Sequence, residues 1–156
     1  MLPESQLSNY WRSLIAYIQS NYTTTQIYFS GENELDTKTI PEWVEFIWST
    51  QVPYVFARHM DNAHPGNIMN ATIGAIIYVK PTTVVGRIVT IRDVVVDLLR
   101  RPLIEVKDWT GTKNVIGALQ GEGLISDVAL GISEDLNRWS LGFRFRYQEQ
   151  FERVRP

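Results

Sequence analysis

The stretch ATIGAIIYVKPTTVVGRIVTIRDVVVDLLRR, residues 71–101, decides the fold because it joins an apolar strand to an amphipathic helix through a turn. Ala71 to Val79 is short, rich in β-branched residues and followed closely by Pro81, which is typical of a well-buried strand. The turn beyond it contains proline and glycine, both of which interrupt regular structure. We therefore expect a strand at 71–79 and a change of element soon afterwards.

The second half of this stretch is rich in valine and isoleucine, which by propensity alone would favour a strand. Its polar residues nevertheless recur three or four apart and so fall on one face of a helix: Thr90, Asp93, Asp97, Arg100 and Arg101. The opposite stripe is apolar and consists of Ile88, Ile91, Val95, Leu98 and Leu99. The pattern predicts an amphipathic helix that ends before Pro102 and needs a sheet on which to lie.

The remaining patterns predict one more helix and several strands. Residues 5–22 place apolar and aromatic side chains three and four apart, with Ser5 as the expected N-cap, and predict the first helix. Alternating or continuous apolar runs predict strands at 26–29, 42–50, 54–59, 103–109, 124–132 and 139–147. We expect the third of these to pair with the second, and the last two to close the fold as a hairpin around residues 133–137.

Two polar or glycine-rich segments resemble binding loops only superficially. Residues 32–40 lack the spacing of acidic ligands that a calcium loop requires and predict a solvated loop. The run GALQGEG, residues 117–123, lacks the Lys-Ser/Thr of a phosphate loop and predicts a mobile linker.

Together the elements predict an α+β fold, with a mixed, mainly antiparallel β-sheet packed against an N-terminal helix and a second amphipathic helix. The 156-residue length fits a single domain, which we place at residues 1–150, with a C-terminal tail at residues 151–156.

Composition and charge exclude several classes of function. The chain has no cysteine, which excludes a thiol nucleophile, thiolate metal ligands and disulfides. Its formal charge is −2, and even the more basic part after residue 66 carries only twelve bases against ten acids, too few for a nucleic-acid-binding footprint. No segment approaches the ~18 uninterrupted apolar residues of a membrane span, and we expect no membrane association and no signal peptide.

The strand predicted at residues 42–50 is apolar on both faces. Trp43 and Ile47 point to one side, whereas Val44, Phe46 and Trp48 point to the other. In a single domain one of these faces meets water unless something covers it, and a neighbouring subunit is the simplest cover. A helix of the same chain is the alternative. The five tryptophans and seven tyrosines of the chain fit interface anchors, although core packing explains each of them equally well.

The last strand separates apolar from basic residues. One face carries Leu141, Phe143 and Phe145, which should pack on the core, and the other carries Arg144 and Arg146. These guanidinium groups face either solvent or the carboxylates of a partner.

We take a set of aromatic and basic residues as candidates for a subunit or partner interface. The candidates are Trp43, Phe46, Trp48, Arg58, Arg144 and Arg146.

The turn RHMDNAHPG, residues 58–66, is the one segment that suggests metal chemistry. His59, Asp61 and His64 provide two imidazoles and a carboxylate, a ligand set that zinc accepts. A solvated loop between strands is the simpler interpretation, because Asp-Asn and Pro-Gly mark a flexible turn. We therefore expect no resident metal, no cofactor and no enzymatic activity.

Three segments of the chain resemble the tail terminator, or tail completion, proteins of long-tailed bacteriophages. They are EWVEFIWST at 42–50, GAIIYVKPTTVVGRIVTIRDVVVDLLRR at 74–101 and WSLGFRFRY at 139–147. These segments look like that family's corresponding strand, strand-turn-helix and final strand, and the resemblance in pattern covers nearly the whole chain.

This resemblance implies an α+β domain that assembles as a homo-oligomer, a hexameric ring. In the family the ring caps the last ring of tail tube protein, stops its polymerisation and offers its other side to the head-completion or connector protein. DNA would pass the central channel without sequence-specific binding. The expected location is the tail or neck of the virion after assembly in the host cytoplasm, and the loops at 31–40 and 59–70 are expected to contact neighbouring rings.

Three alternatives to a tail terminator remain open at this point. The first is that the chain is another neck or tail-completion component. The second is that it is a small metal-dependent enzyme that uses His59, Asp61 and His64. The third alternative is a ligand-binding module that holds a small apolar molecule among the aromatic residues of the 42–50 strand.

Overall fold

The computed structural model describes residues 3–49, 68–81, 85–109 and 111–149 of the chain. This part contains two helices and six strands in the order α1 (Pro3–Asn21), β1 (Gln26–Phe29), β2 (Glu42–Ser49), β3 (Ile68–Val79), α2 (Arg87–Leu99), β4 (Leu103–Lys107), β5 (Val115–Ser133) and β6 (Leu136–Glu149). The strands form one sheet in the order β1-β2-β3-β6-β5-β4. All described pairs are antiparallel except β1 with β2, which are parallel. The predicted α+β fold is confirmed.

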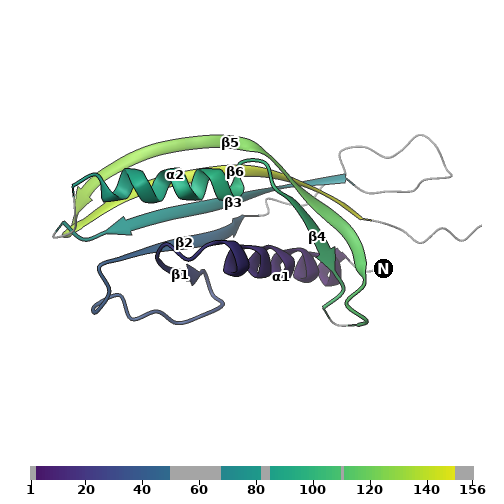
Figure 1. The fold of residues 1–156 in the computed structure, drawn as a ribbon. Coiled ribbons are helices and arrows are strands. Elements are labelled where there is room, and N and C mark those ends of the chain that lie inside the picture. Colours follow the sequence, from purple (N-terminus) through teal and green to yellow (C-terminus); the bar gives the residue numbers. More distant parts are fainter. Residues whose placement is uncertain (1–2, 50–67, 82–84, 110, 150–156) are drawn as a thin grey trace, which may run out of the picture.

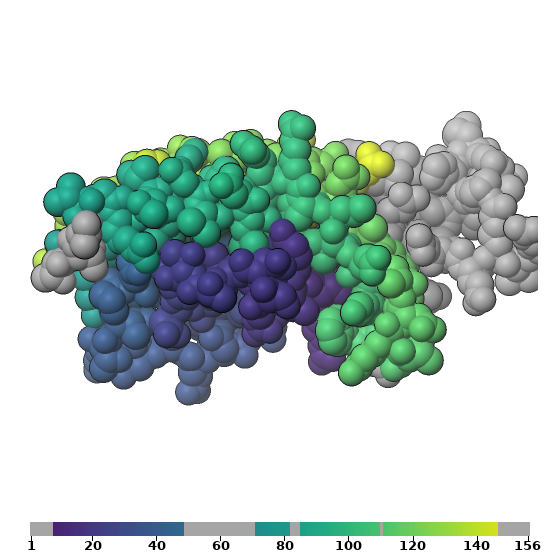
Figure 2. Space-filling view, viewed as in Figure 1, coloured from purple at the N-terminus to yellow at the C-terminus, as the bar shows by residue number. Residues whose placement is uncertain are grey.

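Both helices lie on the same face of this sheet. In Figure 1 the strands run behind the two helices, and β5 arches above α2 before it bends down toward β4. Figure 2 shows α1 in purple and α2 in teal side by side on the face turned to the viewer. Their contact includes a hydrogen bond of 2.9 Å from the Tyr17 hydroxyl to the carbonyl of Leu98. We call this side of the sheet the covered face.

The core lies between the covered face and the helices. Alternate residues of β3 point into it and are all buried, as period-2 geometry requires: Ala71, Ile73, Ala75, Ile77 and Val79. The predicted apolar stripe of α2 is confirmed, since Ile88, Ile91, Val95, Leu98 and Leu99 are all buried. Strand β6 adds the predicted core residues Leu141, Phe143 and Phe145.

Polar groups of α1 hold the short edge strand β4 in place. The side-chain oxygen of Asn9 accepts a hydrogen bond of 3.0 Å from the backbone nitrogen of Trp109. The hydroxyl of Ser13 accepts two more, from the backbone nitrogen of Lys107 at 3.1 Å and from the indole nitrogen of Trp109 at 3.0 Å. Because Asn9 and Ser13 are buried, these bonds also offset the cost of removing their side chains from water.

Two arginines of α2 fix the helix to the sheet. The guanidinium of Arg87 donates to both carboxylate oxygens of Glu42 on β2, with the shortest distance 2.7 Å. Arg92 forms ion pairs with Asp93 and with Asp127 of β5. The indole nitrogen of Trp139 donates to the same Asp127 at 2.6 Å, so the contact joins α2, β5 and β6.

Several predicted boundaries are wrong. Residues 117–123, expected to be a linker, lie inside the 19-residue strand β5 and pair with both β4 and β6. Helix α1 begins at Pro3 rather than after Ser5, which agrees with the preference of proline for the first turn. Strand β2 has β1 and β3 as its two neighbours, and the segment 54–59 that was expected to pair with it lies outside the described residues.

The far half of β5 departs from a regular strand. Register shifts occur at three places, near Gly121, Leu124 and Ala129, and each inserts an extra residue opposite β6. The alternation of Val128, Leu130 and Ile132 in the sequence predicts that they share one face of this strand, but all three are exposed. The register shift between Ala129 and Gly131 pairs Val128 with Ser140 but Ile132 with Asn137, so these two side chains no longer share a face.

The outer edge of β1 is closed by a side chain. The backbone nitrogen of Phe29 donates to the side-chain oxygen of Asn33 at 2.6 Å, and the side-chain nitrogen of Asn33 donates to the carbonyl of Ile27 at 3.0 Å. The Asn33 side-chain amide thus forms hydrogen bonds with two backbone groups of β1 on the edge that faces away from β2.

Candidate interaction surface

The face of the sheet opposite the helices is the candidate functional site, and we call it the open face. No helix in the described part of the chain covers it. Its centre is formed by β2, β3 and β6, on which Ile47 and Ile76 are only partly buried. Strand β5 extends it with Ile125 and Val128, whose side chains are 48% and 49% exposed. An apolar sheet surface of this kind is a feature of interaction sites.

Two glycines lie side by side at the middle of the open face, but only Gly74 leaves its backbone partly accessible, because a Cβ atom at Gly142 would lie 2.6 Å from the hydroxyl of Ser126. Gly74 of β3 and Gly142 of β6 are register partners in the two central strands. A Cβ atom at Gly74 would find its nearest neighbour, the Cβ of Ile47, at 3.7 Å, which is ordinary contact. The fold therefore does not require a glycine there for lack of space. Glycine within a strand often marks a place where another backbone approaches closely.

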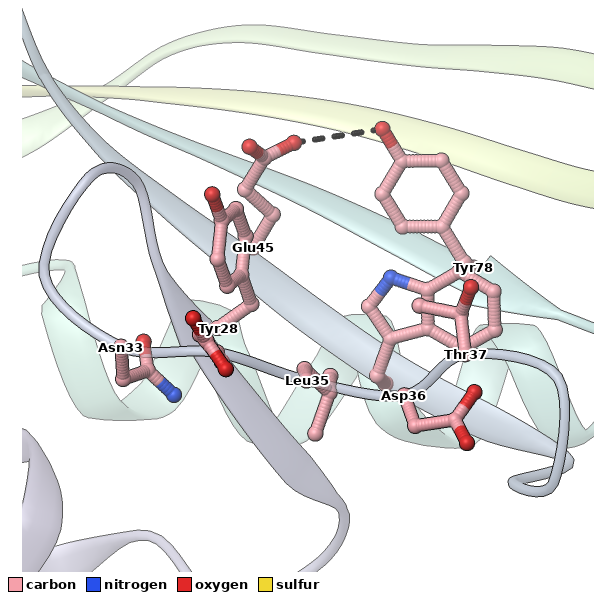
Figure 3. A pocket seen from close by; sticks show the side chains of 9 residues that line it. Tyr28, Asn33, Leu35, Asp36, Thr37, Glu45 and Tyr78 are labelled. Carbon is pink, nitrogen blue, oxygen red and sulfur yellow. Dashed lines mark hydrogen bonds between the residues drawn. The ribbon is translucent and has the colours of Figure 1, made fainter.

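A cavity of about 650 Å³ lies at one end of the open face, where the loop between β1 and β2 folds over the sheet. In Figure 3 the loop that carries Leu35, Asp36 and Thr37 crosses in front of the strand that carries Glu45. The cavity is lined by Tyr28, Asn33, Glu34, Leu35, Asp36, Thr37, Trp43, Glu45 and Tyr78. The described lining thus combines three aromatic rings with three carboxylates and includes no lysine or arginine.

The floor of this cavity is an ordered aromatic pair. The rings of Trp43 and Tyr78 are stacked, with centroids 5.0 Å apart and an angle of 15° between their planes. The hydroxyl of Tyr78 donates to Glu45 at 3.2 Å, as the dashed line in Figure 3 marks. Burial, followed by the charge of Glu45, raises the pKa of Tyr78 above its usual value. Tyr78 therefore keeps its proton and remains a hydrogen-bond donor at neutral pH.

Short-range bonds hold the loop over the sheet. Beyond the contacts of Asn33 with β1, the carboxylate of Asp36 accepts a hydrogen bond of 3.0 Å from the backbone nitrogen of Lys38. The ammonium of Lys80 donates to the carbonyl of Lys38 at 3.0 Å, and its backbone nitrogen donates to the carbonyl of Pro41 at 2.9 Å. The end of β3 thus holds the far end of the loop, and the cavity is built by the fold itself.

The arginines of β6 lie on the same open face. Arg144 and Arg146 are exposed, and no hydrogen bond or ion pair joins either guanidinium to a residue whose side chain the structure describes. Arg138 is the register partner of Tyr78 and is only partly exposed. Its Nε atom is buried and has no hydrogen-bond partner among the described residues. The open face therefore carries positive groups along β6 and negative groups at the β1–β2 end.

The predicted interface residues fall into different environments. Phe46 is fully buried in the core, and Trp48 is partly buried on the same covered face, where its ring lies 5.6 Å from that of Trp11. Trp43 is on the open face but is only 6% exposed. A helix of the same chain therefore covers Phe46 and Trp48, and we assign Phe46 to the core rather than to an interface.

This arrangement also removes the ligand-binding module that required all three aromatic residues at one site. Trp43 lies on the open face, whereas Phe46 and Trp48 lie on the covered face, so the sheet separates them. Arg144 and Arg146 lie on the open face as expected.

Arg58, His59, Asp61 and His64 lie outside the described residues. Among the residues that are described, no group of three or more histidine, aspartate or glutamate side chains is placed to hold a metal ion. Neither of the two described helices combines the length and apolarity needed to cross a bilayer.

Sequence reasoning missed the cavity because its residues come from separate segments. In the sequence, the loop could be compared only with the spacing of calcium ligands. The pairing of Trp43 with Tyr78 depends on the register between β2 and β3. One signal was available in the sequence. Tyr78 follows Ile76 and Gly74 at period 2, which places it on the face opposite Ile73 and Ile77.

Comparison with known proteins is informative about the fold only. No family model and no curated protein matches the chain. A solved structure of a protein whose name states no function has 7% sequence identity and a TM-score of 0.54, and the match covers 97% of this chain and 98% of that chain. The two chains share an overall fold over nearly their full length.

Proposed function

We propose that this protein is a virion structural protein that forms a ring, expected to be hexameric, on the tail tube of a long-tailed bacteriophage. In this role it caps the tube, stops its polymerisation and joins it to the head-completion or connector protein at the neck, while DNA passes the channel. Two kinds of support favour the proposal. One is the resemblance of three segments to tail terminator proteins, and the other is the surface chemistry of the sheet.

The observation that carries the proposal is the open face of the central strands. It presents Ile47 and Ile76 around the partly accessible backbone of Gly74, flanked by the exposed arginines of β6. The two helices of the described residues occupy the other side of the sheet. Burial of such a surface against neighbouring subunits would stabilise an assembly at about 25 cal/mol for each Å² of apolar surface removed from water. Contacts of this kind close into a ring when each subunit repeats them around an axis.

Two measurements on the purified chain test the proposal. Native mass spectrometry should show a closed multimer, alone or after addition of tail tubes, and electron microscopy should show the protein at tube ends only. Ile76→Asp should reduce assembly because it places a charge on the open face. Thr90→Asp, on the exposed side of α2, is the matched control and should assemble normally. A chain that stays monomeric and does not bind tubes would contradict the proposal.

The same measurements separate a tail terminator from another neck component. A terminator binds the end of the tube and blocks further addition of tube protein. A different neck protein would form a ring that leaves tube growth unaffected.

A further inference from the structure

The cavity at the β1–β2 end of the open face has the chemistry of a site for a planar cation. Tyr28, Trp43 and Tyr78 contribute aromatic rings, and Glu34, Asp36 and Glu45 contribute carboxylates. A guanidinium group stacks on aromatic faces and also binds carboxylates through paired hydrogen bonds. A compact ammonium group makes less use of the rings, so this lining favours arginine over lysine.

The carboxylates retain the capacity to bind such a group. Glu45 accepts one hydrogen bond from Tyr78, and Asp36 accepts one from the backbone nitrogen of Lys38. Each carboxylate has two oxygens with about four acceptor positions in all, so most of them remain available. Glu34 is exposed on the loop. The cavity therefore carries acceptors in excess of the donors that this chain places beside it.

Among the described residues, no cation of the same copy fills the cavity. Arg138 lies beside Tyr78 in the register and Lys80 binds the carbonyl of Lys38, but neither residue lines the cavity. Arg144 lies six positions from Arg138 along β6, which corresponds to about 20 Å at ~3.3 Å per residue. An arginine side chain cannot span that distance, so Arg144 and Arg146 reach such a cavity only on another molecule.

We propose that this cavity receives the Arg144–Arg146 pair of a second copy of the chain. The inference rests on the ring assembly proposed above and names a contact within it. Each copy then offers an acidic aromatic socket, defined by Glu34, Asp36 and Glu45, and a basic plug, defined by Arg144 and Arg146. The repeated contact of plug with socket is heterologous, which is the type of contact that closes a ring. Charge complementarity also sets the orientation of neighbouring copies.

Charge reversal tests this contact directly. The plug variant is Arg144→Glu with Arg146→Glu, and the socket variant is Glu34→Lys with Asp36→Lys. Each variant alone should lower the apparent association constant at least about tenfold, because like charges then meet across the contact. An equimolar mixture should restore assembly, since each reversed group meets an opposite charge on its neighbour. Native mass spectrometry of that mixture should show even-numbered, alternating assemblies.

The controls carry the same charge changes away from the open face. Arg100→Glu with Arg101→Glu, at the exposed end of α2, matches the plug variant, and Asp93→Lys with Asp97→Lys, on the exposed side of α2, matches the socket variant. Both controls should assemble like the unmodified chain. Circular dichroism and thermal unfolding of every variant verify that the fold is retained.

Disulfide trapping gives a second, independent measurement because the chain has no cysteine of its own. Glu34→Cys and Arg144→Cys chains, mixed and oxidised, should yield a cross-linked dimer, whereas Glu34→Cys with Arg100→Cys should not.

The outcomes separate this inference from the proposed function. If both reversal variants assemble on tail tubes as strongly as the unmodified chain, and the cysteine variants do not cross-link, the proposed contact is overturned. The proposed ring assembly is then unaffected. If the socket variant disrupts assembly and the plug variant does not, the assignment of Arg144 and Arg146 as the plug is overturned. An unmodified chain that does not associate, together with no cross-link between the two cysteine variants, overturns the contact, and failure of the unmodified chain to bind tubes as well overturns the function.

Discussion

The two faces of strand β3 meet different environments although they alternate along one chain segment. On the covered face Ile73, Ala75 and Ile77 are fully buried beneath the helices, whereas Gly74 and Ile76 on the open face remain partly accessible to water. The covered face therefore supplies most of the hydrophobic stabilisation of the fold. The open face contributes less, and its residues can be changed with less effect on folding. This difference separates positions that determine stability from positions at which the proposed association can be tested.

The largest effect is expected on the covered face. Ile73→Ala should lower the free energy of unfolding by about 2–5 kcal/mol, because it removes a fully buried side chain and leaves a cavity. Urea denaturation followed by circular dichroism measures the change. Ile76→Ala on the same strand is the matched control and should cost about 1 kcal/mol in the isolated chain, since its side chain is only partly buried. Equal losses for the two variants would contradict the distinction between the faces.

A buried tyrosine next to the covered face gives a test through pH. Burial raises the pKa of Tyr22 from 10.0 to about 12, and its hydroxyl also forms a hydrogen bond of 2.8 Å with Thr25. The folded state therefore keeps this proton where the unfolded state has lost it. Stability from this group is fully present below pH 10 and is lost between pH 10 and pH 12, by about 3 kcal/mol in total.

Unfolding by urea at several pH values measures this loss. Tyr22→Phe should show a flatter decline above pH 10 than the unmodified chain, because it has no proton to release. Identical slopes for both proteins would mean that Tyr22 is not protected from ionisation by the fold.

A smaller effect is expected for a polar contact on the open face. Tyr78→Phe keeps the ring that stacks on Trp43 but removes the hydrogen bond to Glu45. Because this contact is partly exposed, the variant should lose only about 0.5–1 kcal/mol of stability. Thermal unfolding measures the loss, with Tyr78→Ala as the control that also removes the stacking. A loss as large as that of Ile73→Ala would show that the floor of the cavity belongs to the folding core.

The smallest effect on stability should be favourable. Gly74→Ala should leave the isolated chain equally stable or more stable by about 0.5 kcal/mol, because alanine restricts the unfolded chain and its Cβ fits at 3.7 Å from Ile47. The same substitution should weaken assembly if a partner backbone approaches this position closely. Chemical denaturation and native mass spectrometry of one preparation measure both quantities. Unchanged assembly would place the contact elsewhere on the open face.

Much of the covered face was predictable from the sequence because its signal is periodic. The stripe from Ile88 to Leu99 recurs at helical spacing, and alternate residues of β3 and β6 are apolar. Here local pattern and tertiary packing agree, so a single sequence is enough to assign the elements and the buried side.

The errors arose where the pattern is local but the structure depends on distant partners. Glycines in residues 117–123 suggested a linker, yet pairing with β4 and β6 on both sides makes this segment a strand. Phe46 was predicted to be an interface residue, although the helices cover it and it lies in the core. The cavity could not be predicted because it requires both the β2–β3 register and the path of the loop.

The Asn33 amide has a consequence for how copies of the chain can meet. It occupies the outward hydrogen-bonding positions of Ile27 and Phe29, where an incoming strand would otherwise dock. Ribbon-like growth through this margin, the route by which many β-proteins form fibrils, is therefore blocked. A single side chain thus closes the β1 edge of the sheet to strand addition, and the proposed association would have to use other surfaces.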